Sequence, residues 1–196
     1  MRQRCEWALS SSPAGLDYHD QEWGAPERDE RRLFELLTLE GAQAGLAWET
    51  VLAKRAGYRA LFSGFDPSFV ARLGGSDVDA MLLDPRIIRH RAKIESVIAN
   101  ARAIESLRAG GGSLSSLLWS FVDGTPLQAK RASVSDLPAF VPLAAQMARE
   151  LKSLGFQFIG PTTCYSLMQA AGLVNDHTTD CFRWAELSGE SEGESS

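Results

Sequence analysis

Potential metal ligands gather at the two ends of this chain. Cys5 and His19 lie in the first 19 positions and His177 and Cys181 in the last 20, although the chain has only three cysteines and three histidines. Two cysteines and two histidines are a common tetrahedral zinc set, and four protein ligands make a structural site. A fold that used all four would have to bring its ends together. The alternative is that they are ordinary buried cysteines and unrelated histidines.

The spacing of apolar residues predicts a chain made mostly of helices. No convincing strand alternation is present, Asp29 and Asp66-Pro67 are typical helix starts, and Ser76 is a candidate N-cap. If His177 and Cys181 lie on a helix, their i, i+4 spacing puts them on one face. The expected fold class is all-α, with helices at 29–39, 46–62, 66–73, 76–83, 88–108, 114–122, 142–154 and 161–171.

Composition sets the broad class of protein. Apolar residues make up 44% and charged residues 23%, as in ordinary globular domains. The absence of a long apolar run, of a secretion signal and of an even cysteine count favours a cytoplasmic protein without a membrane span. Residues 186–196 are acidic and rich in glycine and serine, so we expect a disordered tail after one domain at 1–185. Without the tail the chain is nearly neutral, which leaves nucleic acid possible as a partner.

Glu40 is a charged residue on a helix face that should be buried. The apolar stripe of Leu33 and Leu37 continues through position 40 to Ala44. Because a buried carboxylate without a partner is costly, Glu40 either pairs with a basic residue or lines a pocket, unless the helix has ended by Gly41.

Four aromatic residues, Trp7, Tyr18, Trp23 and Trp48, lie within the first 48 positions. Any one of them is explained by a place in the core. Together with one carboxylate, however, they suit a flat, cationic ligand, because the faces of electron-rich rings attract positive charge.

A short turn between two helices is a candidate anion site. The sequence GFQFIG at 155–160 separates two helical segments, and Pro161 is well placed to begin the second. Backbone N–H groups at such a helix start can bind a DNA phosphate without reading sequence. The basic run 86–93 supports this interpretation, although most charge runs are simply solvated.

The combined pattern resembles the 3-methyladenine DNA glycosylase I family, with similarity from about residue 1 to 184. The spacing from Cys5 to His19 is one residue longer than expected. The motifs that carry the resemblance are Cys5-x-Trp7, Tyr18-His19-Asp20-x-Glu22-Trp23-Gly24, Leu39-Glu40-x-x-Gln43-Ala44-Gly45-Leu46-x-Trp48, Ile88-Arg89-His90-Arg91-x-Lys93-Ile94, Gly155-Phe156-x-Phe158-Ile159-Gly160-Pro161-Thr162 and Val174-Asn175-Asp176-His177-x-x-x-Cys181.

The resemblance implies a helix-hairpin-helix glycosylase fold, with two helical lobes around a base pocket and one structural zinc joining the N- and C-terminal segments. The zinc ligands would be Cys5, His19, His177 and Cys181. The pocket would contain Glu40 as the catalytic or recognition carboxylate, with Tyr18, Trp48, Trp7 and Trp23 as substrate-binding residues. The DNA contacts would come from Leu46, as a wedge in the duplex, and from Gly155, Phe158, Gly160 and Thr162.

The implied activity is that of a monomeric, monofunctional glycosylase that hydrolyses the N-glycosidic bond of N3-methyladenine in alkylated double-stranded DNA. It would release 3-methyladenine and leave an abasic site. Recognition is the favoured role of Glu40, and Asp176 is not assigned as a catalyst. Two alternatives are a zinc-stabilised DNA-binding module with a degenerate pocket and a zinc deaminase, although the H-x-E and P-C-x-x-C motifs of deaminases are missing.

Overall fold

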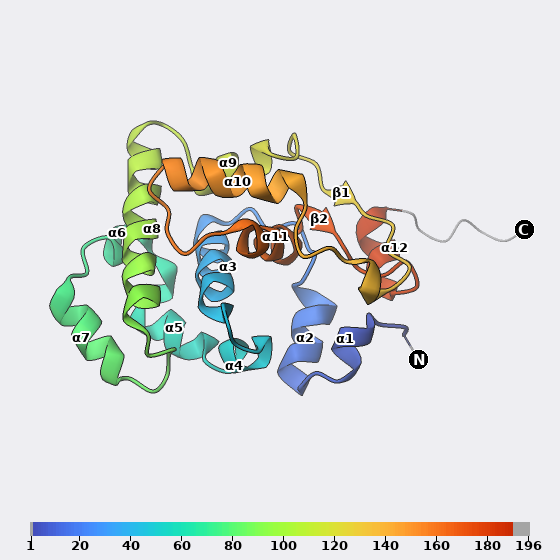
Figure 1. The fold of residues 1–196 in the computed structure, drawn as a ribbon, viewed down its shortest axis with the longest axis horizontal. Coiled ribbons are helices and arrows are strands. Elements are labelled where there is room, and N and C mark those ends of the chain that lie inside the picture. Colours follow the sequence, from blue (N-terminus) through green and yellow to red (C-terminus); the bar gives the residue numbers. More distant parts are fainter. Residues whose placement is uncertain (1, 190–196) are drawn as a thin grey trace, which may run out of the picture.

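A computed structural model describes residues 2–189, and most of them are helical (Figure 1). The expected tail overlaps the last helix as far as Ser188, and its positions 190–196 lie outside the described residues. The elements are α1 (Glu6–Leu9), α2 (Pro13–Gln21), α3 (Glu30–Gln43), α4 (Trp48–Leu52), α5 (Arg55–Leu61), η1 (Ser63–Phe65), α6 (Pro67–Val70), α7 (Gly75–Leu83), α8 (Arg91–Ala109), α9 (Leu114–Ser120), β1 (Leu127–Gln128), η2 (Val134–Asp136), α10 (Pro142–Ser153), α11 (Pro161–Ala170), β2 (Val174–Asn175) and α12 (Phe182–Ser188).

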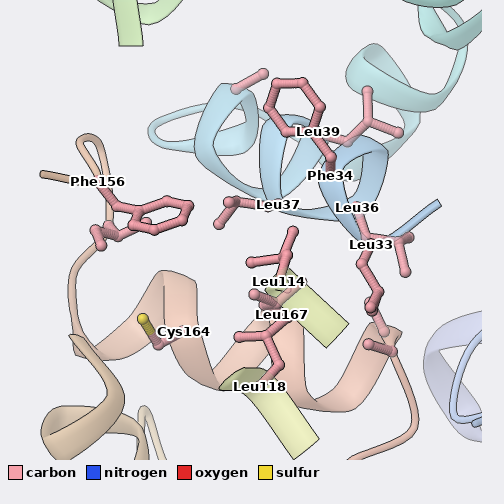
Figure 2. Packing of buried hydrophobic residues seen from close by; sticks show 14 of the residues in the cluster. Leu33, Phe34, Leu36, Leu37, Leu39, Leu114, Leu118, Phe156, Cys164 and Leu167 are labelled. Atoms are coloured by element: carbon pink, nitrogen blue, oxygen red, sulfur yellow. The ribbon is translucent and has the colours of Figure 1, made fainter. Parts of the chain in front are cut away.

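Helix α3 lies at the centre of the molecule, with α11 packed beside it (Figure 1). Its apolar side chains meet those of α9, α11 and the α10–α11 turn in one core (Figure 2). Burial of this apolar surface is the main force that holds the helices together. The labelled core residues are Leu33, Phe34, Leu36, Leu37, Leu39, Leu114, Leu118, Phe156, Cys164 and Leu167.

The predicted helix starts are confirmed at two of three positions. The Asp29 carboxylate accepts a hydrogen bond from the Arg32 N–H at 2.9 Å, and Asp66 caps α6, which begins at Pro67. Ser76 is not an N-cap. Helix α7 begins one residue earlier, where the Asp77 carboxylate accepts from the Gly74 N–H at 2.8 Å.

The segment 46–62, expected as one helix, forms two helices separated by a turn. Val51 of α4 and Tyr58 of α5 are both buried, and the Tyr58 hydroxyl accepts a hydrogen bond from the Ile88 N–H at 3.3 Å. Two separate packing surfaces therefore override the continuous helical pattern. Helices α1, α2 and α12 were not predicted.

The fold is mostly helical, as expected, and it also contains two strands of two residues each that the sequence pattern did not predict. Strands β1 and β2 pair in parallel, with Leu127 opposite Val174 and Gln128 opposite Asn175. A further bridge pairs Arg131 with Thr178. Two-residue strands are too short to show alternation, which explains why the sequence gives no sign of them.

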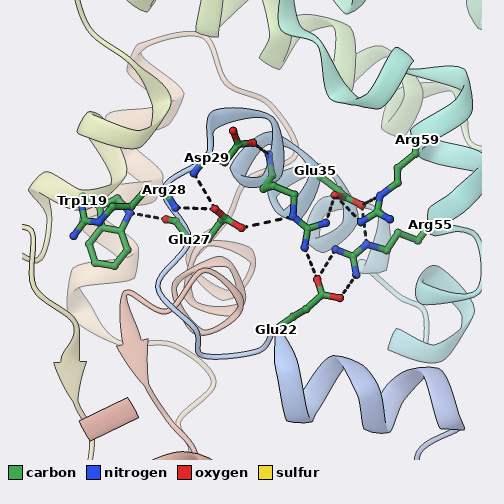
Figure 3. A network of polar contacts seen from close by, with 9 residues as sticks. Glu22, Glu27, Arg28, Asp29, Glu35, Arg55, Arg59 and Trp119 are labelled. Carbon is green, nitrogen blue, oxygen red and sulfur yellow. Dashed lines mark hydrogen bonds and ion pairs between the residues drawn. The ribbon is translucent and has the colours of Figure 1, made fainter. Parts of the chain in front are cut away.

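A network of charges centred on buried Glu35 and Arg55 joins α2, α3 and α5 (Figure 3). The Glu35 carboxylate accepts hydrogen bonds from Arg55 Nε and Arg59 Nε, both at 2.7 Å, and from Arg32 at 3.0 Å. Arg55 also binds Glu22 at the end of α2. Each buried charge has an opposite charge beside it, so the network fixes the position of α2 against α3.

The two ends of the described chain lie together, as the ligand pattern requires. The Phe182 N–H donates to the Gln3 carbonyl at 2.9 Å, and α1, α2 and α12 occupy the same end of the molecule (Figure 1). None of the helices within residues 2–189 is both long and apolar enough to cross a membrane.

Gly57 provides a test of this packing. A Cβ atom at this position would lie 2.3 Å from the carbonyl oxygen of Arg86. We therefore expect Gly57→Ala to lower the free energy of unfolding by about 1–3 kcal/mol, as overpacking generally does. Denaturant unfolding measures this, with Gly75→Ala as the control, because no atom lies near its added Cβ. Equal stability of the two variants would contradict the close approach.

Candidate active site and metal centre

The predicted pocket residues line one cavity of about 290 Å³. Its walls come from α1, α2, α3, α4 and α11 and from the loop that follows β1. All five predicted residues are present, and five further residues were missed. The complete lining is Trp7, Tyr18, Trp23, Glu40, Gln43, Trp48, Val134, Leu137, Ser166 and Gln169.

Glu40 lies in the wall of this cavity and is only 7% exposed. Helix α3 continues past it to Gln43, so the helix has not ended at Gly41. Within residues 2–189 no hydrogen bond or ion pair reaches the Glu40 carboxyl. Burial raises its pKa to about 8. Of the alternatives left open by the sequence, the structure therefore supports a carboxyl that lines a pocket.

Tyr18 and Trp48 form an aromatic pair beside Glu40. Their ring centroids are 5.0 Å apart and their planes are tilted by 41°. The Tyr18 hydroxyl and Trp48 Nε1 are buried, and neither has a hydrogen-bond partner in the described chain. Burial, followed by the charge of Glu40, raises the pKa of Tyr18. Unpartnered buried polar groups are rare in proteins and are typical of a site that awaits a ligand.

Trp7 and Trp23 connect the cavity to the cluster of metal-ligand residues. Their ring centroids are 5.2 Å apart, and the planes are nearly perpendicular. Trp7 packs against the His19 ring at 5.1 Å, and Trp23 packs against the His177 ring at 4.6 Å. One wall of the cavity is therefore also the shell of the cluster.

The four predicted metal ligands form one buried cluster, with all ligand atoms within 4.8 Å of one another. Cys5 Sγ lies 3.4 Å from His177 Nδ1, and Cys181 Sγ lies 3.6 Å from His19 Nε2. In a tetrahedral zinc site with ordinary Zn–S and Zn–N bonds, neighbouring ligand atoms are about 3.5 Å apart. The donor set and its spacing fit zinc.

The outer nitrogens of both imidazoles have partners that fix the rings. His19 Nδ1 lies 2.8 Å from the Asp20 carboxylate, and His177 Nε2 donates to the Trp23 carbonyl at 2.9 Å. Hydrogen bonding to Arg4 lowers the pKa of Asp20 to about 2 and keeps it negatively charged. Such outer partners are usual for zinc-binding histidines and leave the inner nitrogens free for metal.

His177 and Cys181 are not on one helix, contrary to the expectation from their spacing. They are held by a turn, and Cys181 is the N-cap residue of α12. The Cys181 N–H donates to the Thr178 carbonyl at 2.8 Å, which closes this turn. Compact turns, like helices, can bring positions i and i+4 together.

The predicted helix–turn–helix hairpin is formed by α10 and α11. Gly155 turns the chain with a φ of +92°, and Pro161 is the first residue of α11. Phe156 and Ile159 are buried in the angle, whereas Phe158 is 37% exposed. Gly160, the N-cap, leads into the start of α11, where exposed Thr162 lies. The turn therefore presents Gly155, Gln157 and the ring of Phe158 to solvent.

Helix α8 holds this hairpin and the end of α3. Asn100 binds the backbone of Gln157 twice, accepting from its N–H at 2.7 Å and donating to its carbonyl at 3.2 Å. Lys93 donates to the carbonyls of Ala42 and Ala44 at 2.8 and 2.7 Å. A cation at the negative end of a helix is stabilising.

Leu46 lies just beyond this anchored helix end and is 38% exposed. It lies in an exposed loop, and its role as a wedge stays a prediction. Much of the basic run has other partners, however. Arg86 pairs with Asp84, and Arg91 pairs with Asp79. The run therefore supports a DNA surface less than its charge suggests.

Two other residues agree with their sequence interpretation. Cys164 is fully buried in the core of α11. Asp176 is also buried and does not line the cavity; it is hydrogen-bonded to Tyr165, Gln169 and Arg131. This environment gives no support for a direct catalytic role of Asp176.

Comparison with known proteins identifies the family. A family model described as methyladenine glycosylase matches residues 7–184. DNA-3-methyladenine glycosylase 1 of Escherichia coli (strain K12) is 46% identical over 179 residues, which cover 91% of this chain and 95% of that protein.

Solved structures give the same result. A crystal structure of 3-methyladenine DNA glycosylase I has a TM-score of 0.90 and 50% identity, and the match covers 92% of this chain and 98% of that chain. The Staphylococcus aureus 3-methyladenine DNA glycosylase I, in a structure concerned with 3-methyladenine recognition, has a TM-score of 0.86 and 38% identity, covering 89% of this chain and 94% of the other. The chain belongs to the methyladenine glycosylase family and is a DNA glycosylase.

Proposed function

We propose that this chain is a monofunctional glycosylase that removes N3-methyladenine from alkylated duplex DNA. One water molecule is consumed: the bond between the base and the sugar C1′ breaks, and the cationic base keeps the bonding electrons and leaves as neutral 3-methyladenine. The sugar C1′ gains a hydroxyl group from water, and the remaining proton is released. An abasic site remains. The turn between α10 and α11 contains no lysine that could act as a nucleophile instead of water. A DNA substrate and three free cysteines favour the cytoplasm.

The observation that carries the proposal is the unpaired carboxyl of Glu40 inside an aromatic cavity. Methylation at N3 gives the adenine a positive charge before the bond breaks, which already weakens that bond. A cationic base in this cavity meets the faces of aromatic rings and one acidic group. Neutral adenine lacks this attraction, so the cavity favours the damaged base.

Glu40 has a role in recognition in this proposal. Its pKa of about 8 means that the carboxyl of the free protein is mostly protonated at neutral pH. A cationic base beside it favours the carboxylate, which can accept a hydrogen bond from the exocyclic amine of the base. The same negative charge would also stabilise positive charge that develops on the sugar.

The DNA surface is formed by the α10–α11 hairpin and by Leu46. The backbone around Gly155, Phe158, Gly160 and Thr162 would hold a phosphate group at the start of α11, as in helix-hairpin-helix proteins. Leu46 would fill the gap that the extruded nucleotide leaves. Extrusion costs a few kcal/mol, and an apolar wedge offsets part of this cost. The chain would act as a monomer with one domain at 1–185, two helical lobes and the pocket between them.

Zinc would be held by Cys5, His19, His177 and Cys181 as a structural ion. Four protein ligands leave no position for substrate, so the ion stabilises the closure of the chain ends and takes no part in bond cleavage. Its position behind Trp7 and Trp23 also gives the metal an indirect effect on the shape of the cavity.

Glu40→Gln tests the recognition role. We expect affinity for free 3-methyladenine to fall about 10- to 100-fold, because a hydrogen bond to a charged group is lost. Calorimetric titration measures this, and Glu95→Gln, at an exposed position of α8, is the matched control. Unchanged affinity together with lost turnover would assign Glu40 to bond cleavage.

The pH profile of excision tests the ionised form of Glu40. Because burial raises the pKa to about 8, kcat/KM should rise with pH and level off above this value.

The raised pKa also means that the wild-type fold loses stability as pH rises from the usual glutamate pKa to about 8. Glu40→Gln should remove this loss of stability. The measurement is the melting temperature of each protein as a function of pH. The same pH dependence in both proteins would contradict the burial of an ionisable carboxyl.

Cys181→Ala tests the metal site. We expect zinc content and melting temperature to fall together, since removal of one ligand opens the link between the chain ends. Metal analysis and thermal unfolding measure the two effects. Cys164→Ala, which changes a buried cysteine outside the cluster, should lower stability but keep zinc. A native protein that is equally stable without zinc would overturn the assignment.

Leu46→Ala tests the wedge. Excision from duplex DNA should fall because the gap in the duplex is no longer filled, whereas affinity for free 3-methyladenine should stay the same. Single-turnover excision and base titration give the two values. Leu83→Ala, at an 82% exposed leucine on α7, is the control. An equal loss in both assays would instead indicate damage to the pocket.

A further inference from the structure

Gln169 of α11 is a second polar group in the wall of the cavity, and sequence reasoning gave it no role. Its backbone is fixed, because the Gln169 carbonyl accepts a hydrogen bond from the Gly24 N–H at 3.0 Å. Its side-chain Nε2 donates to Asp176 Oδ2, also at 3.0 Å. The orientation of the Gln169 amide therefore depends on Asp176.

Asp176 is surrounded by groups that donate hydrogen bonds to it. Its side chain is fully buried and forms an ion pair with Arg131, whose Nε lies 3.2 Å from Asp176 Oδ1. The Tyr165 hydroxyl donates to Oδ2, the oxygen that Gln169 also contacts. A carboxylate only accepts hydrogen bonds. Gln169 must therefore turn its NH₂ group toward Asp176 and its carbonyl oxygen away.

The carbonyl oxygen Oε1 of Gln169 remains available to a ligand. It accepts no hydrogen bond within residues 2–189, and it is not among the buried polar atoms that lack a partner. The cavity wall thus contains two acceptors, Gln169 Oε1 and the carboxylate form of Glu40. An exocyclic amino group has two N–H donors, one for each.

This arrangement can distinguish adenine from guanine. Adenine has an amino group at C6, which donates hydrogen bonds, whereas guanine has a carbonyl oxygen there, which only accepts them. Two acceptors in the wall suit the first base and repel the second. A side-chain amide that was free to rotate would accommodate either base, because it could turn its NH₂ group toward the oxygen of guanine.

We propose that Gln169 is a specificity-determining residue and that Asp176 is the positioning residue that fixes its amide, so that the pocket favours 3-methyladenine over 3-methylguanine. The inference rests on the proposed function and extends it to the choice of base. Asp176 acts through Gln169 and does not touch the base.

The test measures kcat/KM for release of 3-methyladenine and of 3-methylguanine from duplex DNA, and compares their ratio among variants. Gln169→Met keeps the approximate volume of the side chain and removes its polar atoms. We expect the ratio to fall about tenfold, the effect of one hydrogen bond. Asp176→Asn should lower it similarly, because an asparagine can donate to Gln169 as well as accept from it.

A double-mutant cycle separates positioning from general damage. If Asp176 acts through Gln169, Asp176→Asn adds no further loss of selectivity in the Gln169→Met background. Tyr165→Phe is the control, since it removes another donor to Asp176 but keeps the contact with Gln169. It should lower stability and leave the ratio unchanged. Zinc content is measured for each variant, because Asp176 adjoins His177.

The outcomes are distinct. If the wild-type protein is active and Gln169→Met leaves the ratio of the two kcat/KM values unchanged, the inference is overturned and the proposed function is not. The substitution lies at the cavity surface, where it affects folding least. An additive loss in the double variant overturns the role of Asp176. A wild-type protein that releases neither base overturns the proposed function, and this inference with it.

Discussion

The fold depends on how one central helix buries two carboxyl groups in opposite ways. Glu35 and Glu40 lie five positions apart on α3, and both are almost inaccessible. Three arginines neutralise Glu35, whereas in the described part of the chain no basic side chain pairs with Glu40, which faces the aromatic cavity. The first arrangement fixes the helices around α3, and this rigidity offsets the cost of the second. The energetic cost of the site thus falls on groups of the cavity wall, namely the Glu40 carboxyl, the Tyr18 hydroxyl and Trp48 Nε1.

Much of the site could be predicted because its residues break a local pattern. Glu40 interrupts an apolar stripe, and the cysteines and histidines gather at the chain ends, so both are visible without a structure. Gln169, Ser166, Val134 and Leu137 could not be found in this way. They are ordinary residues in a helix or a loop, and only long-range packing brings them to the cavity. The division of 46–62 into two helices was missed for the same reason, since tertiary contacts decided it.

Helix α8 shows how a surface for a large ligand can be aligned by a single element. Asn100 and Lys93 are seven positions apart, which puts them on the same side of the helix, two turns from each other. One holds the hairpin turn and the other holds the end of α3 before Leu46. The separation between the α10–α11 turn and Leu46 is therefore set by the pitch of α8.

The short ladder between β1 and β2 connects the wall of the cavity to the cluster of cysteines and histidines. The loop after β1, which contributes Val134 and Leu137 to the cavity wall, is joined by backbone hydrogen bonds to the segment with His177 and Cys181. The N–H groups of Leu127, Ala129 and Thr179 donate to the carbonyls of Leu173, Asn175 and Arg131, respectively. The loop that lines the cavity and the turn that holds Cys181 are therefore anchored to each other, so a displacement of either strand would disturb both.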